Sequence, residues 1–208
     1  YNAGFCGPVG CDAAQLDITA VETRDLFTGL QSIEVTPADA TLVVRGESAT
    51  QDYTVTGVYS DGRRATIPLG TWSNTATPAG AIARGTSRFV ATGLTGGTTR
   101  VAVEIARDDG PALRAETGLT VRFQRDVYVN GAPPSVQTRF ATPVMDPARQ
   151  VTLRYPLDGA VMPQNVAPPD VQWEGGDSGD AYRIRLVRGL ASVTGYLLHS
   201  GAFGCGIE

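Results

Sequence analysis

Apolar and polar residues alternate in short stretches along residues 31–123, and this alternation predicts β-strands. In the stretch TTRVAVEIA, one face carries Val101, Val103 and Ile105, while arginine, alanine and glutamate occupy the positions between them. A period of two is typical of a strand with one buried face. The stretch TGLTVRF has the same pattern, with apolar residues Leu119, Val121 and Phe123. Strands of about five residues, repeated every 8 to 12 residues or so, predict a β-sandwich.

Two glycine-containing stretches predict turns between these strands. Asp61-Gly62 favours a type I′ hairpin, because both central residues of that turn need positive φ. The stretch GLTGGTT lies between the runs RFVA and TTRVAVEI. A phosphate-binding loop needs a following helix and usually a lysine, but here a strand pattern follows. We therefore expect GLTGGTT to close a hairpin, in which Gly93, Gly96 and Gly97 turn the chain.

The pattern changes after residue 123. Residues 124–150 contain four prolines, which cannot donate to a β-ladder, so they predict a linker or an extended segment at a sheet edge. Residues 151–208 resume the alternation, with Tyr182, Ile184 and Leu186 separated by arginines. This block is short, since a complete immunoglobulin-like sandwich needs about 100 residues. We expect a second β-module that is partial or is completed by another chain.

The composition excludes several function classes. The chain has no lysine, and its 17 basic residues are all arginine. A lysine Schiff base, a phosphate-loop lysine and a lysine–asparagine crosslink are therefore impossible. With a net charge of −4 and scattered arginines, the chain has no basic stripe for nucleic acid. No apolar run approaches the roughly 20 residues of a membrane span, and a start at Tyr1 favours a processed, exported protein.

Three cysteines offer two interpretations. Cys6 and Cys11 lie in the loop CGPVGC, and in an exported protein we expect them to form a disulfide, with Cys205 left over. The alternative is a zinc site made of these three cysteines and His199. Structural zinc sites usually have closely spaced ligand pairs, and the spacing here fits them poorly. We therefore expect no metal and no cofactor.

The phrases of residues 33–121 resemble the bacterial Ig-like domains of group 2, the intimin/invasin-like type. IEVTP opens the series, YTVTGVYSDG follows, Trp72-Ser73 lies at the Trp-Ser position, and FVATGLTGGTTRVAV ends it. The closing phrase of the family falls on Phe89, Ala91, Gly93, Leu94, Gly97, Thr98 and Val101. The match covers about 90 of the 208 residues. It departs from the family in ATPAGAI, which leaves the loop after Trp72 undefined.

The second block is similar, more loosely, to the opening of fibronectin-type β-sandwich modules. Such modules follow Ig-like repeats in large surface proteins of myxobacteria-like, high-GC bacteria. Both resemblances imply an extracellular or cell-surface protein that serves as a stalk, spacer, adhesin or fibre component. Neither implies catalysis.

A few residues are candidates for packing or binding. Trp72 is expected in the core, as in other Ig-like sandwiches, together with Phe89, Val101, Val103 and Ile105. Trp173 has two interpretations, as a core residue or as an exposed platform for a sugar or a protein partner. In the second case, Tyr182 and Tyr196 are expected to share the binding surface.

Two further kinds of site have weaker support. Glu174, Asp177 and Asp180 carry oxygen ligands for calcium, but calcium needs 6 to 8 or so oxygens and three carboxylates fall short. A hydrolase needs a nucleophile, a base and an orienting group. Nothing in the sequence places the single histidine, His199, in such a constellation.

These observations predict an all-β, multi-module chain that is not an enzyme. Its expected parts are an N-terminal segment at residues 1–30, an Ig-like sandwich at 31–123, a proline-rich linker at 124–150 and a second β-module at 151–208. The expected function is that of an exported surface module in a stalk or fibre, with other subunits of the same assembly as partners. Unpaired sheet edges and residues 124–150 are expected to pair with a neighbouring subunit by strand addition. The alternative function is an adhesin or carbohydrate-binding module.

Overall fold

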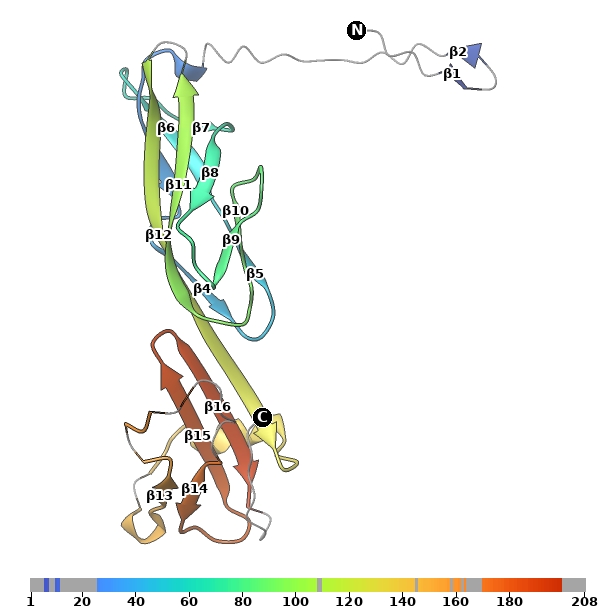
Figure 1. Cartoon of the computed structure of the whole chain (residues 1–208), viewed down its shortest axis with the longest axis vertical. Helices are drawn as coiled ribbons and strands as arrows, with labels where there is room; N and C mark the ends of the chain where they lie inside the picture. The colour runs from blue at the N-terminus through green and yellow to red at the C-terminus, as the bar shows by residue number, and fades with distance from the viewer. Residues whose placement is uncertain are drawn as a thin grey trace.

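The computed structural model describes residues 26–107, 110–144, 146–157, 159–161, 163 and 170–199, together with the backbone of residues 6–7 and 10–11. The chain is built from β-strands arranged as two modules that lie end to end (Figure 1). An all-β architecture was expected from the alternating pattern, and the structure confirms it. The short N-terminal strands are β1 (Cys6–Gly7) and β2 (Gly10–Cys11).

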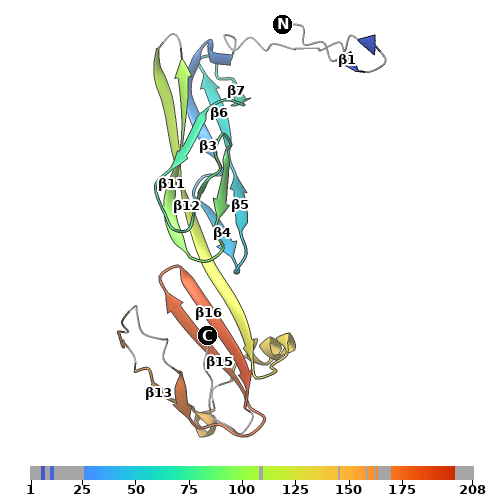
Figure 2. The ribbon, with the colours of Figure 1, turned by 45° about the vertical axis from the view of Figure 1, so that its right-hand side comes forward.

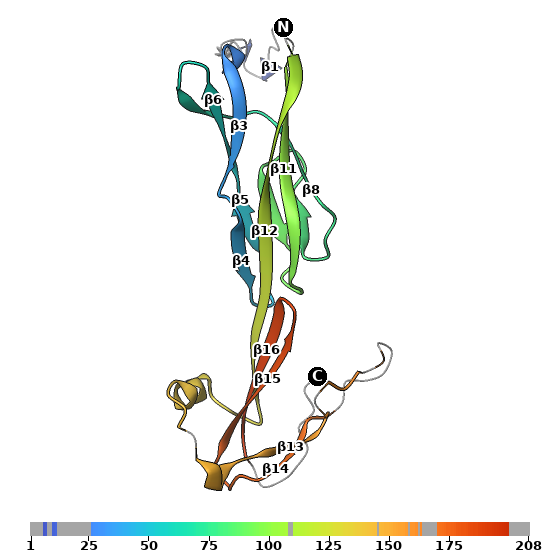
Figure 3. The ribbon, with the colours of Figure 1, turned by 90° about the vertical axis from the view of Figure 1, so that its left-hand side faces the viewer.

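The first module is a sandwich of two layers. One layer contains β4 (Ala40–Val44), β12 (Gly110–Val129), β11 (Gly97–Arg107) and β8 (Thr71–Asn74), in that spatial order. The other layer contains β3 (Leu30–Thr36), β6 (Thr54–Tyr59) and β7 (Arg64–Ile67), followed along the module by β5 (Ala49–Asp52), β10 (Arg88–Ala91) and β9 (Gly80–Ile82). The two layers face each other in Figure 3. This division of strands between two sheets is typical of an immunoglobulin-type sandwich.

The core between the layers comes from the inward faces of the alternating strands. The completely buried residues include Phe89, Val101, Val103 and Val121, and Ile105 is almost as well buried. Their polar neighbours point outward, because successive side chains of a strand lie on opposite faces. The largest buried cluster comprises Leu30, Ile33, Val35, Val44, Tyr53, Val55, Tyr59, Ile67, Ala79, Phe89, Ala91, Val101, Val103, Ile105, Leu119 and Val121.

Trp72 lies at the edge of this core rather than at its centre. It is half-buried on β8 and packs against Tyr53, with 6.1 Å between the ring centroids. Tyr53 is the more deeply buried of the two aromatic residues, and its hydroxyl has no hydrogen-bond partner among the described residues. Burial raises the pKa of Tyr53 to about 12. Tyr53 therefore contributes a neutral phenol to the core.

The β6–β7 hairpin is present, but its turn type differs from the expected one. Gly62 has a φ of +82°, whereas Asp61 is not among the residues with positive φ. The N–H of Gly62 donates to the carbonyl of Tyr59 (2.9 Å), and the N–H of Tyr59 donates to the carbonyl of Arg63 (3.0 Å). One residue with positive φ fits a type I turn followed by a glycine bulge, so the type I′ prediction is wrong.

The stretch GLTGGTT does not close a hairpin. The strand before it, β10, pairs with β5 and β9, whereas the strand after it, β11, pairs with β8 and β12. The chain therefore crosses from one layer of the sandwich to the other at this point. The glycines allow close packing against other segments as well as a change of direction. A Cβ atom on Gly93, which has a φ of +80°, would lie 2.3 Å from the backbone carbonyl of Glu47.

The predicted linker does not begin at residue 124. Residues 124–129 form the last third of β12, which runs without interruption from the first module into the second (Figure 1). There β12 pairs in parallel with β16 (Ala191–Leu198), which in turn forms an antiparallel hairpin with β15 (Ala181–Arg188). The prolines that indicated a linker all lie after β12. Two of them begin the short 3₁₀ helices η1 (Pro134–Phe140) and η2 (Pro147–Arg149).

The second module contains little buried apolar surface. Besides β15 and β16 it has a short antiparallel pair, β13 (Thr152–Tyr155) and β14 (Gln172–Glu174). Its buried cluster consists of Ala132, Val136 and Tyr196, with Tyr128, Phe140, Ala181 and Leu198 packed around them. Figure 2 shows the β15–β16 hairpin pointing toward the lower end of the first module.

The two modules are joined by backbone contacts as well as by β12. The N–H of Phe123 donates to the carbonyl of Leu190, in the β15–β16 turn, at 2.9 Å. A Cβ atom on Gly96, in the crossover stretch GLTGG, would lie 2.6 Å from that same carbonyl oxygen. Gly96 is therefore needed where the turn of the second module meets the first.

Candidate functional site

A groove of about 620 Å³ in the second module is the candidate site. It lies between the end of η1, the β13–β14 pair and the first half of β15. Apolar side chains dominate its walls, among them Phe140, Val144, Val151, Leu153, Trp173 and Ile184. Its polar groups include Arg139, Asp180 and Arg183. A groove that combines apolar walls with a few polar groups is typical of a binding surface.

The groove follows the edge of β15 that faces away from β16. Four consecutive residues of the strand, 181–184, line the groove. Successive side chains of a strand point to opposite faces. Four consecutive residues can therefore line the groove only if it touches both faces of β15, and this places the groove along the edge of the strand. Among the described strands, β15 pairs with β16 alone. No described strand pairs with the backbone groups on its other side, and an edge of this kind is where a further extended segment can add.

Trp173 and Tyr182 come together in this groove. Trp173 lies on β14 and Tyr182 on β15, and their ring centroids are 5.2 Å apart. The Tyr182 hydroxyl donates to the carbonyl of Gly175 (3.4 Å) and lies 3.1 Å from Nδ1 of His199. The N–H of His199 donates to the carbonyl of Asp180 (2.9 Å), which extends the β15–β16 ladder by one residue.

The indole of Trp173 has an unsatisfied polar atom. Its Nε1 is buried and has no hydrogen-bond partner in the described part of the chain. A buried donor without an acceptor is destabilising by about 1–3 kcal/mol. A ligand or segment that brought a carbonyl or hydroxyl oxygen to this atom would recover that energy.

Tyr196, the third aromatic binding candidate, does not line the groove. It packs in the small core, stacked on Tyr128 with 5.5 Å between ring centroids and tilted against Phe140 at 5.8 Å. Burial is the main cause that raises the pKa of the Tyr196 hydroxyl, and the negative charge of Asp126 raises it further. We assign it to packing.

Two of the three carboxylates considered for calcium have other partners. Glu174 forms an exposed ion pair with Arg154, whose hydrogen bond lowers the pKa of Glu174. One carboxylate oxygen of Asp180 accepts the N–H of Asp177 (2.8 Å) and so stabilises the turn before β15. Among the described residues, no group of three or more His, Cys, Asp or Glu side chains could hold a metal ion.

The cysteines are only partly described. Cys6 and Cys11 lie directly opposite each other in the β1–β2 ladder. Opposite residues of an antiparallel pair have Cα atoms about 4.5–5.5 Å apart, which overlaps the range of disulfides. The side chains of both cysteines, and the whole of Cys205, lie outside the described residues, so the disulfide stays a prediction.

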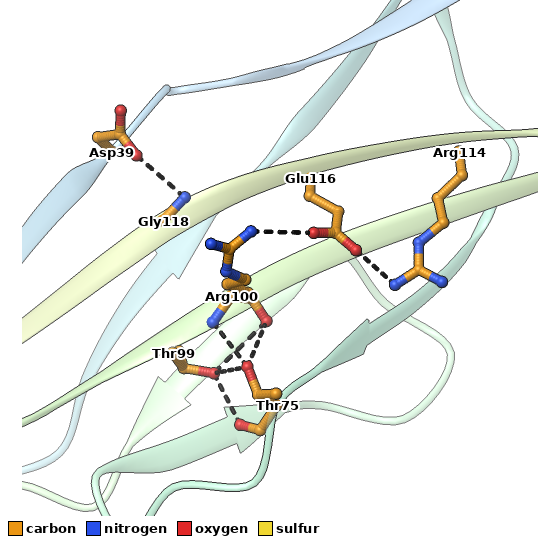
Figure 4. A network of polar contacts seen from close by, with 7 residues as sticks. All are labelled: Asp39, Thr75, Thr99, Arg100, Arg114, Glu116 and Gly118. Atoms are coloured by element: carbon orange, nitrogen blue, oxygen red, sulfur yellow. Dashed lines mark hydrogen bonds and ion pairs between the residues drawn. The ribbon is translucent and has the colours of Figure 1, made fainter.

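A polar network on the first module is structural (Figure 4). Glu116 on β12 forms ion pairs with Arg100 and Arg114, and the Arg100 and Arg114 side chains are exposed. Exposed pairs contribute little free energy, about 0–1 kcal/mol. Beside them, the Thr99 hydroxyl donates to the Thr75 carbonyl (2.7 Å) and so fixes the end of β8 against β11.

Asp39 anchors the β3–β4 connection to β12. Its N–H donates to the Thr117 hydroxyl (2.9 Å). Its carboxylate accepts the N–H of Gly118 (3.2 Å), as Figure 4 shows. A Cβ atom on Gly118 would lie 2.6 Å from that carboxylate oxygen. These contacts position β4 along β12, where the two strands run parallel.

Sequence reasoning singled out Trp173 and Tyr182 but missed the groove itself. The sequence did contain one indication of the groove. Residues 144–161 include apolar residues such as Val144, Val151 and Leu153 that do not follow a clear strand pattern. What joins them to β15 is the folding of the proline-rich segment back along the hairpin, and this arrangement has no local pattern.

Comparisons with known proteins add no further constraint. A scan against models of protein families and a search of curated proteins both returned no match to this chain. In the part of the chain that the structure describes, no helix is long and apolar enough to span a membrane.

Proposed function

We propose that this chain is a non-catalytic structural module of an exported, cell-surface protein, in which it acts as a stalk or fibre component. The observation that carries the proposal is β12. One strand of 20 residues belongs to the sheets of both modules, so the modules share backbone hydrogen bonds on either side of their junction. At about 3.3 Å per residue, this strand alone is roughly 65 Å long.

The junction supports a rod that resists bending. Modules joined by a flexible linker are expected to move relative to each other. Here the Phe123–Leu190 hydrogen bond and the close approach of Gly96 to Leu190 add contacts beside the continuous strand. A spacer that holds a partner away from the cell surface needs to resist bending in this way.

The family resemblance supports the same function. We propose that the first module is a bacterial Ig-like domain of group 2, with Trp72 at the core edge and the GLTGG stretch at the crossover between layers. Export also suits the predicted Cys6–Cys11 disulfide, since disulfides persist in oxidising compartments. Other subunits or modules of the same assembly are the expected partners, and the free edge of β15 is where a fibre would lengthen by strand addition.

Solution scattering tests the rod. A compact chain of this length would have a radius of gyration of about 17 Å, and we expect a clearly larger value with a maximum dimension above about 65 Å. Gly96→Val places atoms where the Leu190 carbonyl lies, so we expect it to loosen the junction and broaden the distribution of dimensions while the first module stays folded. Leu94→Ala, at an exposed position of the same stretch, is the matched control.

Two results would contradict the proposal. A radius of gyration near the compact value would rule out a rod, and a Gly96→Val profile identical to that of the unchanged protein would show that the junction does not depend on this contact. Immunogold labelling of intact source cells tests the location. Label on the outer surface is expected, and label confined to the cell interior would exclude a surface stalk.

The second candidate function is recognition of a carbohydrate. The observation that favours it is the pairing of Trp173 with Tyr182 in the groove, together with the unsatisfied Nε1 of Trp173. Aromatic rings that present an apolar face and a polar hydrogen suit sugar rings.

A glycan array separates the two functions. If the groove binds a sugar, Trp173→Ala should reduce binding at least tenfold, because it removes both the stacking surface and the indole donor. Tyr128→Ala, outside the groove, is the control for general damage to the second module. Absence of binding by the unchanged protein supports the structural function.

A further inference from the structure

The edge of β15 along the groove presents backbone groups at a regular spacing. The N–H of His199 donates to the carbonyl of Asp180 (2.9 Å), so the backbone groups of Asp180 point toward β16. Backbone groups of successive residues in a strand point to opposite sides. Those of Ala181 and Arg183 therefore point away from β16, where no described strand pairs with them. They lie about 7 Å apart, which is the two-residue repeat of an extended peptide.

The two walls of the groove differ in their chemistry. Tyr182 points toward β14, because its ring centroid lies 5.2 Å from that of Trp173. On the same side Leu153 is 52 % exposed, although it is a large apolar residue. Arg183 points to the opposite side, where its guanidinium carbon lies 5.2 Å from the ring centroid of Phe140, at the end of η1. One wall is therefore apolar, and the other combines an aromatic ring with positive charge.

The positive charge of the second wall has no described counter-ion. Arg139 and Arg183 line the groove, and Arg185 points to the same face of β15 as Arg183. None of these three arginines forms an ion pair with a described carboxylate. Asp180 is the single acidic residue among the described residues that line the groove, and its carboxylate accepts the N–H of Asp177 (2.8 Å). An acidic partner is complementary in charge to this wall.

We propose that an extended segment of a neighbouring subunit, in which acidic and apolar residues alternate, adds as a strand to this edge of β15. Its backbone pairs with the outward groups of Ala181 and Arg183. Successive side chains of an added strand point to opposite faces, so the acidic ones lie beside the arginines and the apolar ones cover Leu153 and Trp173. The inference rests on the proposed function as a fibre component and names the kind of segment that lengthens the fibre.

The same edge selects against β15 of a second copy. On the face toward η1, β15 carries Arg183, Arg185 and Val187. If two copies of β15 paired about a two-fold axis, the registers that overlap most of the strand would bring these arginines opposite one another. Like charges on directly opposite residues destabilise a strand pair. A different segment is therefore required, which makes a head-to-tail contact that can continue into a fibre rather than a closed dimer.

Calorimetric titration of the full chain with synthetic peptides tests the proposal. The probe is a short peptide in which aspartate and valine alternate. One control peptide alternates lysine with valine, and another has the composition of the probe with its aspartates and valines in two separate blocks. We expect saturable binding of the probe that weakens as salt is raised, and at least tenfold weaker binding of both controls. Binding of the probe no tighter than that of the controls would overturn the proposal.

Two arginine variants locate the site. Arg183→Gln should weaken binding of the aspartate–valine peptide about tenfold or more, because it removes the charge that faces the acidic side chains. Arg188→Gln makes the same change on the same strand outside the groove, and it should leave binding nearly unchanged. Near-UV circular dichroism shows whether each variant is folded. An equal loss in the two variants would mean that the peptide is attracted by net charge alone, and the groove would not be its site.

Methylation of the peptide backbone tests the strand pairing itself. Alternate amides of an added strand face the edge that it joins. Methylating the amide nitrogens of one set, either the aspartates or the valines, should therefore abolish binding, and methylating the other set should not. Equal affinities of the two methylated peptides would rule out strand addition.

Two further outcomes separate this inference from the functions proposed above. Binding of an oligogalacturonate but not of the peptide would overturn it in favour of an acidic carbohydrate. If no peptide binds but solution scattering still shows a rod, this inference fails and the proposed stalk stands.

Discussion

Replacing Phe89 by alanine is expected to lower the free energy of unfolding of the first module by about 3–5 kcal/mol. The ring is completely buried between the layers of the sandwich, on β10. Its neighbours are close enough that a Cβ atom on Gly80 would lie 2.8 Å from the ring. The alanine variant loses the buried apolar area and leaves a cavity that the rigid backbone of paired strands cannot fill.

The adjacent residue provides the control. Val90 lies on the same strand but faces outward and is 37 % exposed, so Val90→Ala should cost less than about 1 kcal/mol. Urea unfolding followed by the fluorescence of Trp72, in a Trp173→Phe background, measures the first module. Equal costs for the two variants would mean that β10 does not present Phe89 to the core.

Replacing Gly93 by alanine is expected to destabilise the first module strongly, although only one methyl group is added. Gly93 has a φ of +80°, a conformation that costs an alanine about 1–2 kcal/mol. The new Cβ would also lie 2.3 Å from the backbone carbonyl of Glu47. Neither atom can swing away, because the carbonyl is part of the backbone and the Cβ is bonded directly to it. One of the two segments must move, which disturbs the crossover between layers.

Gly62→Ala separates these two contributions. Gly62 has nearly the same φ, +82°, but in its exposed turn no atom of the described residues lies within 4 Å of the position that the new methyl group would take. We therefore expect Gly62→Ala to cost about 1–2 kcal/mol and Gly93→Ala to cost about 1–3 kcal/mol more. The same urea unfolding experiment measures both. A Gly93→Ala variant as stable as Gly62→Ala would show that the crossover is loosely packed.

The candidate site was only partly predictable from the sequence. Trp173 and Tyr182 were recognised as aromatic residues beside a polar loop, and they do meet in one groove. Tyr196 was grouped with them because it is aromatic and lies on a strand pattern nearby. Its register on β16 turns it into the small core instead. Which face of a strand is buried depends on its partner strands, and these come from distant parts of the chain.

Local patterns also misjudged two connections. RFVA and TTRVAVEI are adjacent in the sequence and resemble the two arms of a hairpin, yet β10 and β11 belong to different layers. Residues 124–129 follow a complete strand pattern and precede prolines, yet they continue β12 because β16 supplies a new partner. In each case the deciding factor is a hydrogen-bonded neighbour that is remote in the chain.

The sequence by itself determined that this protein is built from β-strands and which face of several strands in the first module is buried, although Trp72 and Phe123 are only partly buried. Both follow from a period of two, because the alternation of side chains is a property of a single strand. The tertiary structure alone decided that β12 joins the two modules and that one edge of β15, which no described strand pairs with, lies along a groove. Sheet pairing is a contact between distant segments, so no single stretch of the chain carries the information.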